Sequence, residues 1–128
     1  MKLQPDKSDV QSISGYGPGW LAVNGERVVH SVVVSASGGR FDWLCQRFAD
    51  LTPAHFAKLL PQNGPLPELV IFGSGRVLRF VPPAWLAPLM QQRVGLETMD
   101  TLAACRTYNI LAGEGRQVVL AALVEPAS

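Results

Sequence analysis

The sequence predicts a three-layer α/β fold with a mixed central sheet and an N-terminal antiparallel β-hairpin part. Asn24-Gly25 separates two β-rich runs, and this pair favours a tight hairpin turn because both residues tolerate positive φ. From about residue 52 onwards, helical segments alternate with strands, a pattern typical of a sheet with right-handed crossovers. The continuous apolar run Leu69–Phe72 indicates a strand that is covered on both faces.

The first half of the chain supplies the antiparallel part and one short helix. We expect a short strand over 13–16 and, after the hairpin turn, a long returning strand from about 26 to 35. Thr52 is a good N-cap, and Pro53 stands at the first helical position, where its missing N–H does no harm. These two residues predict a short amphipathic helix that stops at Pro61.

The second half supplies the alternating strands and helices. The expected elements are a strand over 69–72, extended chain over 77–81, a helix over 84–92, a strand over 94–98, a helix within 99–116 and a last strand over 117–123. Gly73-Ser74-Gly75 ends the first of these strands. Pro88 disfavours an uninterrupted helix because proline has no backbone N–H to donate. The sequence leaves open whether Pro88 kinks that helix or restarts it.

Length and composition indicate one compact domain. The chain has 128 residues, of which 48% are hydrophobic and 16% charged, so it is long enough and apolar enough to bury a core. We expect a flexible N-terminus over residues 1–11, a single domain over 12–124 and a C-terminal tail over 125–128.

The charge pattern disfavours nucleic-acid and membrane partners. The formal net charge is +1 and the lysines and arginines form no cluster, which argues against a nucleic-acid footprint and against electrostatic membrane anchoring. The apolar run 118–124 is far shorter than the roughly 20 residues of a spanning helix. The first residues also lack the apolar segment of a secretion signal, so we expect a cytoplasmic protein that does not span a membrane.

The residues that most often perform catalysis or bind metals are scattered along this chain. Cys45, Cys105, His30 and His55 match no metal-ligand spacing, so we predict neither a metal nor a cofactor. Cys105 stands in the middle of an expected helix, away from the positive end of the helix dipole that would activate a thiolate. We therefore assign no catalytic residue.

Arg106 is the unusual residue of the expected helix that begins near Met99. On a helical wheel it shares a face with Leu102, Asn109 and Ile110, and small or apolar residues surround it. A helix that is apolar on nearly every side is expected to be buried on nearly every side. Arg106 and Asn109 should then project together into a partly dehydrated place, where a guanidinium needs acceptors or a carboxylate.

Two interpretations of that pair remain open. In the first, Arg106 and Asn109 brace the helix against the Gly73–Gly75 loop and the Gly113–Gly115 turn. In the second, a small anionic ligand lies between Arg106, Asn109 and the backbone of Gly73, Ser74 and Gly75, because α/β sheets tend to bind ligands beyond the ends of their strands. Under either interpretation, we expect Arg106→Ala to lower the free energy of unfolding by about 1–3 kcal/mol. The loop lacks the further glycine of a dinucleotide site and the Gly-Lys-Ser/Thr of a phosphate loop.

Several motifs resemble those of a known family. They are Leu69-Val-Ile-Phe-Gly-Ser-Gly-Arg76, Pro82-Pro83, the stretch Met99–Leu111, Glu114-Gly-Arg116, Gly15-Tyr-Gly17, Val23-Asn-Gly25 and Trp43. Together they resemble the Mth-type domain of unknown function over about residues 12 to 124. The resemblance implies a three-layer α/β fold and a bacterial single-domain member related to the mitochondrial assembly factor of respiratory complex I (NADH:ubiquinone oxidoreductase). The resemblance predicts the fold of the chain and says less about its function.

Two functional hypotheses follow, and the residues do not decide whether the chain is an enzyme. We favour a non-enzymatic interaction or assembly-factor domain, with protein partners that include membrane-complex subunits and with a homodimer left open. Its docking residues would be Trp20, Trp43 and Trp85, because aromatic side chains near turns often anchor partners. The alternative is a binder of small anions, or an unrecognised enzyme, with its site at Arg106, Asn109 and Gly73–Gly75.

Overall fold

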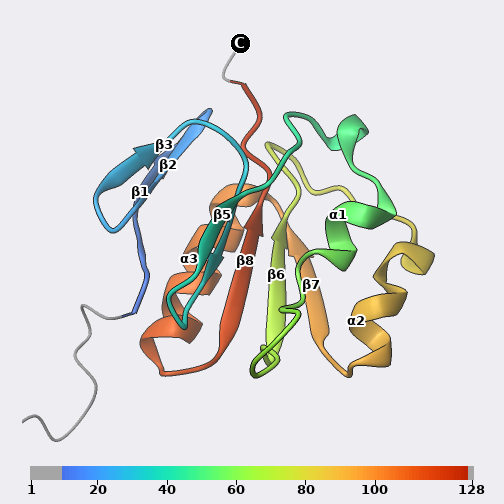
Figure 1. Cartoon of the computed structure of the whole chain (residues 1–128). Helices are drawn as coiled ribbons and strands as arrows, with labels where there is room; N and C mark the ends of the chain where they lie inside the picture. The colour runs from blue at the N-terminus through green and yellow to red at the C-terminus, as the bar shows by residue number, and fades with distance from the viewer. Residues whose placement is uncertain (1–9, 127–128) are drawn as a thin grey trace, which may run out of the picture.

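Two β-sheets form the framework of the protein, in a computed structural model that describes residues 10–126. The smaller sheet is antiparallel and has the order β1-β2-β3, with strands Ile13–Gly17, Trp20–Val23 and Glu26–Val28. The larger sheet has the order β5-β4-β8-β6-β7 and consists of β4 (Val32–Ser35), β5 (Arg40–Asp42), β6 (Leu69–Gly73), β7 (Gly95–Met99) and β8 (Val118–Ala122). This mixed α/β arrangement confirms the predicted fold class (Figure 1).

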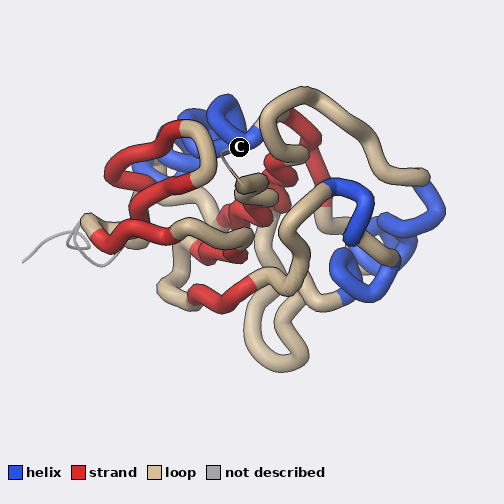
Figure 2. The backbone as a smooth tube through the Cα atoms, turned by 90° about the horizontal axis from the view of Figure 1, so that it is seen from above, coloured by secondary structure: helices blue, strands red, loops and turns tan. Residues whose placement is uncertain are grey.

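The helices cover the larger sheet on both faces. They are α1 (Pro53–Ala57), α2 (Ala87–Gln91) and α3 (Thr101–Gly113), with two 3-10 turns, η2 (Phe48–Asp50) and η3 (Pro83–Leu86). Helix α3 and the small sheet lie on one side, whereas α1 and α2 lie on the other (Figures 1 and 2). No helix within residues 10–126 is long and apolar enough to cross a bilayer.

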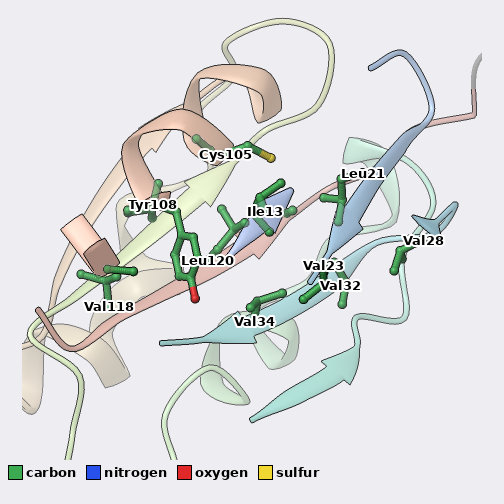
Figure 3. Close-up of a cluster of buried hydrophobic side chains, with 14 of the residues drawn as sticks. Ile13, Leu21, Val23, Val28, Val32, Val34, Cys105, Tyr108, Val118 and Leu120 are labelled. Carbon is green, nitrogen blue, oxygen red and sulfur yellow. The ribbon is translucent and has the colours of Figure 1, made fainter. Parts of the chain in front are cut away.

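Each face of the sheet has its own hydrophobic core. On the α3 side, Cys105 and Tyr108 pack with Leu120 of β8 and with Leu21 of the small sheet (Figure 3). On the other side the core is aromatic: the Phe56 ring lies 5.2 Å from that of Phe72 and 5.7 Å from that of Trp43, in edge-to-face geometry.

The direction of the strands brings four strand ends together. Strands β7 and β8 run parallel to β6, whereas β4 is antiparallel to both β8 and β5. Strands β5, β6, β7 and β8 therefore point the same way, and the segments that follow them leave from one edge. We call this the carboxyl edge, which is uppermost in Figure 1.

Two expected strands differ in the structure, one further strand is present, and the effect of Pro88 is defined. The long returning strand over 26–35 is two strands, β3 and β4, which belong to different sheets because residues 29–31 leave the first sheet. Residues 40–42, which we did not expect to be extended, form the edge strand β5, and residues 77–81 form no strand. Pro88 is the second residue of α2, which follows directly on η3, so the proline restarts the helix at a position that needs no N–H donor.

The described chain begins and ends within the expected terminal segments. Residues 1–9 of the expected flexible N-terminus and residues 127–128 of the expected tail lie outside the described residues. The remainder of both segments is bound to the domain. Gln11 donates its side-chain amide to the carbonyl of Ser35 at 3.0 Å and accepts the Tyr108 hydroxyl at 2.8 Å through its own carbonyl.

Candidate functional site

The Gly73–Gly75 loop lies at the carboxyl edge, between the end of β6 and the start of α3. Gly73 is required there because a Cβ atom would lie 2.9 Å from the Cα atom of Thr101. Gly75 has φ +102°, a conformation that glycine adopts without strain. The two glycines therefore allow the loop to pass close beneath the first residue of the helix.

Protein acceptors already bind the amides of this loop. Ser74 N–H donates to the carbonyl of Met99 at 2.8 Å, and Gly75 N–H donates to Thr101 Oγ1 at 2.9 Å. The Thr101 hydroxyl in turn donates to the carbonyl of Leu123 at 2.7 Å. The loop thus joins the ends of three strands to α3, and it does not present the Ser74 and Gly75 amides to a ligand.

Asn109 braces α3 against the small sheet and not against this loop. Its Nδ2 donates to the carbonyl of Ile13 at 2.8 Å, and its Oδ1 accepts the Ile13 N–H, also at 2.8 Å. Asn109 also lies eight residues after Thr101, about 12 Å along the helix axis. The structure therefore does not bring Asn109 together with Gly73, Ser74 and Gly75.

The prediction that Arg106 is buried is wrong. Arg106 is exposed, and so are its neighbours on the same face of α3, Leu102 and Ile110. The buried face carries Ala104, Cys105, Tyr108 and Ala112 instead. The prediction failed because α3 has apolar residues on both sides, and no segment within residues 10–126 covers the side that carries Leu102 and Ile110.

At the carboxyl edge, the arginine with internal contacts is Arg79 and not Arg106. Arg79 donates through Nη2 to Glu125 Oε1 at 2.6 Å and to the carbonyl of Ser74 at 2.9 Å, and its guanidinium lies 4.9 Å from the centre of the Phe48 ring. Ser74 is fully buried; its hydroxyl donates to the carbonyl of Val77 and accepts the Arg79 N–H. Sequence reasoning missed Arg79, and its pairing with Glu125 links positions 46 residues apart.

A basic hollow of about 310 Å³ surrounds this ion pair. Its walls include Arg47, Arg76 and Arg79, the side chain of Phe48, and Glu125. The Glu125 carboxylate pairs with Arg79, and its Oε1 also accepts the backbone N–H of Arg76. Such a hollow suits an anionic group, because guanidinium donors match the geometry of carboxylate and phosphate.

An apolar hollow of about 360 Å³ adjoins the basic one and shares Arg76 and Glu125 with it. Its walls include Trp20, Leu102 and Leu123. The Trp20 ring lies against Gly17, where a Cβ atom would be 2.6 Å from the indole nitrogen. The glycine of the Gly15-Tyr-Gly17 motif thus makes room for the ring.

Three segments that leave the same edge carry exposed apolar side chains. Leu44 follows β5; Val77, Leu78 and Phe80 follow β6; and Leu102 stands in the first turn of α3. Of the three predicted docking residues, Trp20 and Trp85 are half-buried. Trp43 is only 3% exposed because it belongs to the aromatic core, so it is not displayed to a partner.

Neither thiol is prepared for nucleophilic chemistry. Burial raises the pKa of Cys105 to about 12 and that of Cys45 to about 11. His55 caps α1: its Nδ1 accepts the Thr52 N–H at 3.0 Å, and its Nε2 lies 2.8 Å from the carbonyl oxygen of Leu44. Among residues 10–126, no group of three or more His, Cys, Asp and Glu side chains could hold a metal ion.

Comparison with known proteins identifies the family. Residues 13–123 match the family described as "Protein of unknown function (DUF498/DUF598)". The chain belongs to the DUF498 family. This DUF498 domain is similar to a Bos taurus protein named assembly factor 3 of the NADH dehydrogenase (ubiquinone) 1 alpha subcomplex, with 31% identity over 97% of this chain and 66% of that protein. The chain thus spans about two thirds of the length of that relative.

Solved bacterial structures share the fold of this DUF498 domain. A crystal structure of a Bordetella parapertussis protein is 37% identical and covers 91% of this chain and 97% of its own, with a TM-score of 0.82. The solution structure of a Bordetella pertussis protein, described as a Mth938-like domain, is 34% identical, with a TM-score of 0.78 over 100% of this chain and 95% of its own. These similarities confirm the resemblance to the Mth-type family.

Proposed function

We propose that this DUF498 domain is a non-enzymatic interaction domain that binds a protein partner on the surface at its carboxyl edge. One observation supports the proposal: exposed large apolar side chains stand in three separate segments that leave this edge, and one of them, Leu102, lines the apolar hollow. Exposed apolar groups that cluster in this way mark interaction sites, because their transfer out of water drives association.

The proposed docking surface has exposed side chains that can insert into a partner, and it has a hollow that can bind a side chain of the partner. Phe80 is 69% exposed, and a large aromatic side chain of this kind anchors many interfaces. The hollow beside Trp20 and Leu102 can receive an apolar side chain of the partner in return. This arrangement requires no chemistry from the chain itself.

The relatives suggest the kind of partner. The Bos taurus relative is named as an assembly factor, and the similarity extends over nearly the whole of this chain. By analogy, the partner is a subunit of a multisubunit membrane complex, which the domain binds in the cytoplasm during assembly. This analogy supports the assembly-factor role through homology alone.

Site-specific cross-linking tests the location of the docking surface. The photoreactive amino acid p-benzoylphenylalanine replaces Phe80 in one variant and Met90 in a matched control, since these side chains are 69% and 68% exposed. Met90 lies in α2, which precedes β7, and β7 begins at the opposite edge of the sheet. After irradiation of living cells, we expect a discrete product with another protein from position 80 and none from position 90.

Three results contradict the proposal. Identical products from both positions show that the surface is not selective, and no product from position 80 shows that it is not a docking surface. A product that contains only a second copy of this chain identifies a homodimer and contradicts the assembly-factor role. Mass spectrometry of the products distinguishes these outcomes.

A further inference from the structure

We propose that Asn63 is the preferred site of a spontaneous covalent modification, in which its side-chain amide is lost as ammonia and aspartate or isoaspartate remains. Asn63 stands in the loop between α1 and β6, at the edge of the sheet opposite the carboxyl edge (Figure 1). The inference goes beyond the proposed function and does not depend on it. Its basis is a contrast between the two Asn-Gly pairs of the chain, Asn63-Gly64 and Asn24-Gly25.

The reaction needs only an asparagine, the backbone nitrogen of the next residue, and water. That nitrogen loses its proton and attacks Cγ of the asparagine; the Cγ–N bond of the side-chain amide breaks, and ammonia leaves. Water then opens the resulting succinimide ring at either of its two carbonyl carbons. One product is aspartate, and the other is isoaspartate, in which the backbone runs through Cγ. A following glycine favours the attack because it has no Cβ atom to hinder the approach.

Both reacting groups are free at Asn63-Gly64. The two residues are exposed, in a segment that is neither helix nor strand. Within residues 10–126, no hydrogen bond engages the Asn63 side chain or the Gly64 N–H. A Cβ atom on Gly64 would meet no atom within 4 Å, so there is open space beside the residue that attacks. Nothing in this part of the fold has to open before the ring can form.

The same two groups are engaged at Asn24-Gly25. The Gly25 N–H donates to Ser14 Oγ at 2.8 Å, and Asn24 Oδ1 accepts the Ser12 N–H at 2.9 Å. The amide of Asn24 is thereby directed towards Ser12 and away from the nitrogen that would attack it. Both hydrogen bonds must break before the ring can form, so the hairpin that favours this Asn-Gly pair also protects it.

The modification changes the wall of a third hollow. Asn63 lines an apolar hollow of about 250 Å³, together with Val33, Leu59 and Leu66. Val33 and Leu59 belong to the core on the α1 side of the larger sheet. Either product places a carboxylate in the wall of this hollow, and isoaspartate also lengthens the backbone of the loop by one carbon atom.

Peptide mapping of the full chain tests the inference. The folded protein is kept at mildly alkaline pH, sampled over days and digested with trypsin, which leaves the two Asn-Gly pairs in separate peptides, residues 8–27 and 59–76. Mass spectrometry measures the fraction of each peptide in which OH has replaced NH₂, and protein L-isoaspartate methyltransferase labels the isoaspartate. We expect Asn63 to react about 30-fold faster than Asn24, because two hydrogen bonds, each equivalent to about a fivefold change in an equilibrium, must break at Asn24.

Two variants and one condition test the cause. Ser14→Ala removes the acceptor of the Gly25 N–H, so Asn24 should react about fivefold faster while Asn63 keeps its rate. Asn63→Gln keeps an amide but requires a larger ring, so its peptide should stay unmodified, which excludes the neighbouring Gln62 as the source of the signal. In concentrated urea the parent should react at similar rates at both asparagines, because unfolding removes the protection.

Three results overturn the inference. Equal rates at the two asparagines of the folded protein show that the fold creates no preference. An Asn63 that reacts only after unfolding shows that the loop holds its amide away from Gly64. An equal acceleration of both sites by Ser14→Ala shows that general unfolding, and not the bond to Gly25, controls the reaction. None of these results bears on the docking surface, which lies at the carboxyl edge.

Discussion

The hydrogen bonds between Asn109 and Ile13 make a strong prediction about stability. Asn109→Ala removes the donor and the acceptor that bind the Ile13 carbonyl and N–H, each at 2.8 Å. The two backbone groups lie against α3 where β1 meets it, and Ile13 is buried. The substitution therefore leaves a donor and an acceptor without partners at the junction of helix and small sheet.

The expected loss follows from the two bonds. Each contributes about 1 kcal/mol net, and leaving partly buried backbone groups unpaired adds to this, so the free energy of unfolding should fall by about 2–3 kcal/mol. For a chain of 128 residues, an unfolding entropy of roughly 2 cal/mol/K per residue converts each kcal/mol into about 4 °C. Thermal unfolding should therefore occur about 8–12 °C lower.

Urea and thermal unfolding followed by circular dichroism measure this loss, with Arg106→Ala as the control. Arg106 stands on the same helix but is exposed, so its replacement should change stability by less than about 0.5 kcal/mol. The reasoning is refuted if Asn109→Ala unfolds at the parent's midpoint, or if Arg106→Ala loses as much stability as Asn109→Ala.

Three further variants test the packing and the charges. Gly73→Ala should lower stability by about 1–3 kcal/mol in urea unfolding, because the new Cβ meets the Thr101 backbone at 2.9 Å; a parent-like midpoint would contradict the close approach. Burial raises the pKa of Cys105 from 9.0 to about 12, so stability should be complete below pH 9 and fall as pH rises towards 12; a Cys105→Ala variant with an equally steep alkaline decline would contradict this. The hydrogen bond from the Gln117 N–H lowers the pKa of Glu68 below 4.5, so its stabilisation should be present above that pH and disappear as pH falls through the lowered value. Glu68→Gln should therefore lose less stability than the parent on acidification, and parallel acid titrations of the two proteins would count against this account.

Local sequence patterns predicted which segments form strands, turns and helices better than they predicted which of these segments pack together. The Asn24-Gly25 turn is formed, with φ 49° at Asn24, and Thr52-Pro53 begins α1 as expected. The division of 26–35 between two sheets has no local signal, because valines in either strand look the same in sequence. Burial of α3 could not be assigned correctly for a related reason: apolar residues pack equally well in a core and on a docking surface.

The residues of the candidate site were harder to predict because their contacts are distant in sequence. Asn109 was singled out correctly as a polar residue with an internal partner, but that partner is Ile13, which lies 96 positions earlier. Arg79 meets Glu125 across 46 positions, and nothing near either residue indicates the pairing. One sign was available: Val77, Leu78 and Phe80 are apolar in a segment between prolines and glycines, where a regular strand is not favoured.

The position of β8 in the larger sheet has a consequence for the order in which the chain can fold during synthesis. β8 lies between β4 and β6, yet it follows every other described strand along the chain. A nascent chain that ends before residue 118 holds β4-β5 and β6-β7 as separate pairs, with apolar faces and open edges on both sides of the missing strand. Such pairs are marginal on their own and prone to pairing with other chains. The larger sheet can therefore be completed only after β8 has been synthesised. Until then, chaperones that bind exposed strand edges would act on this protein.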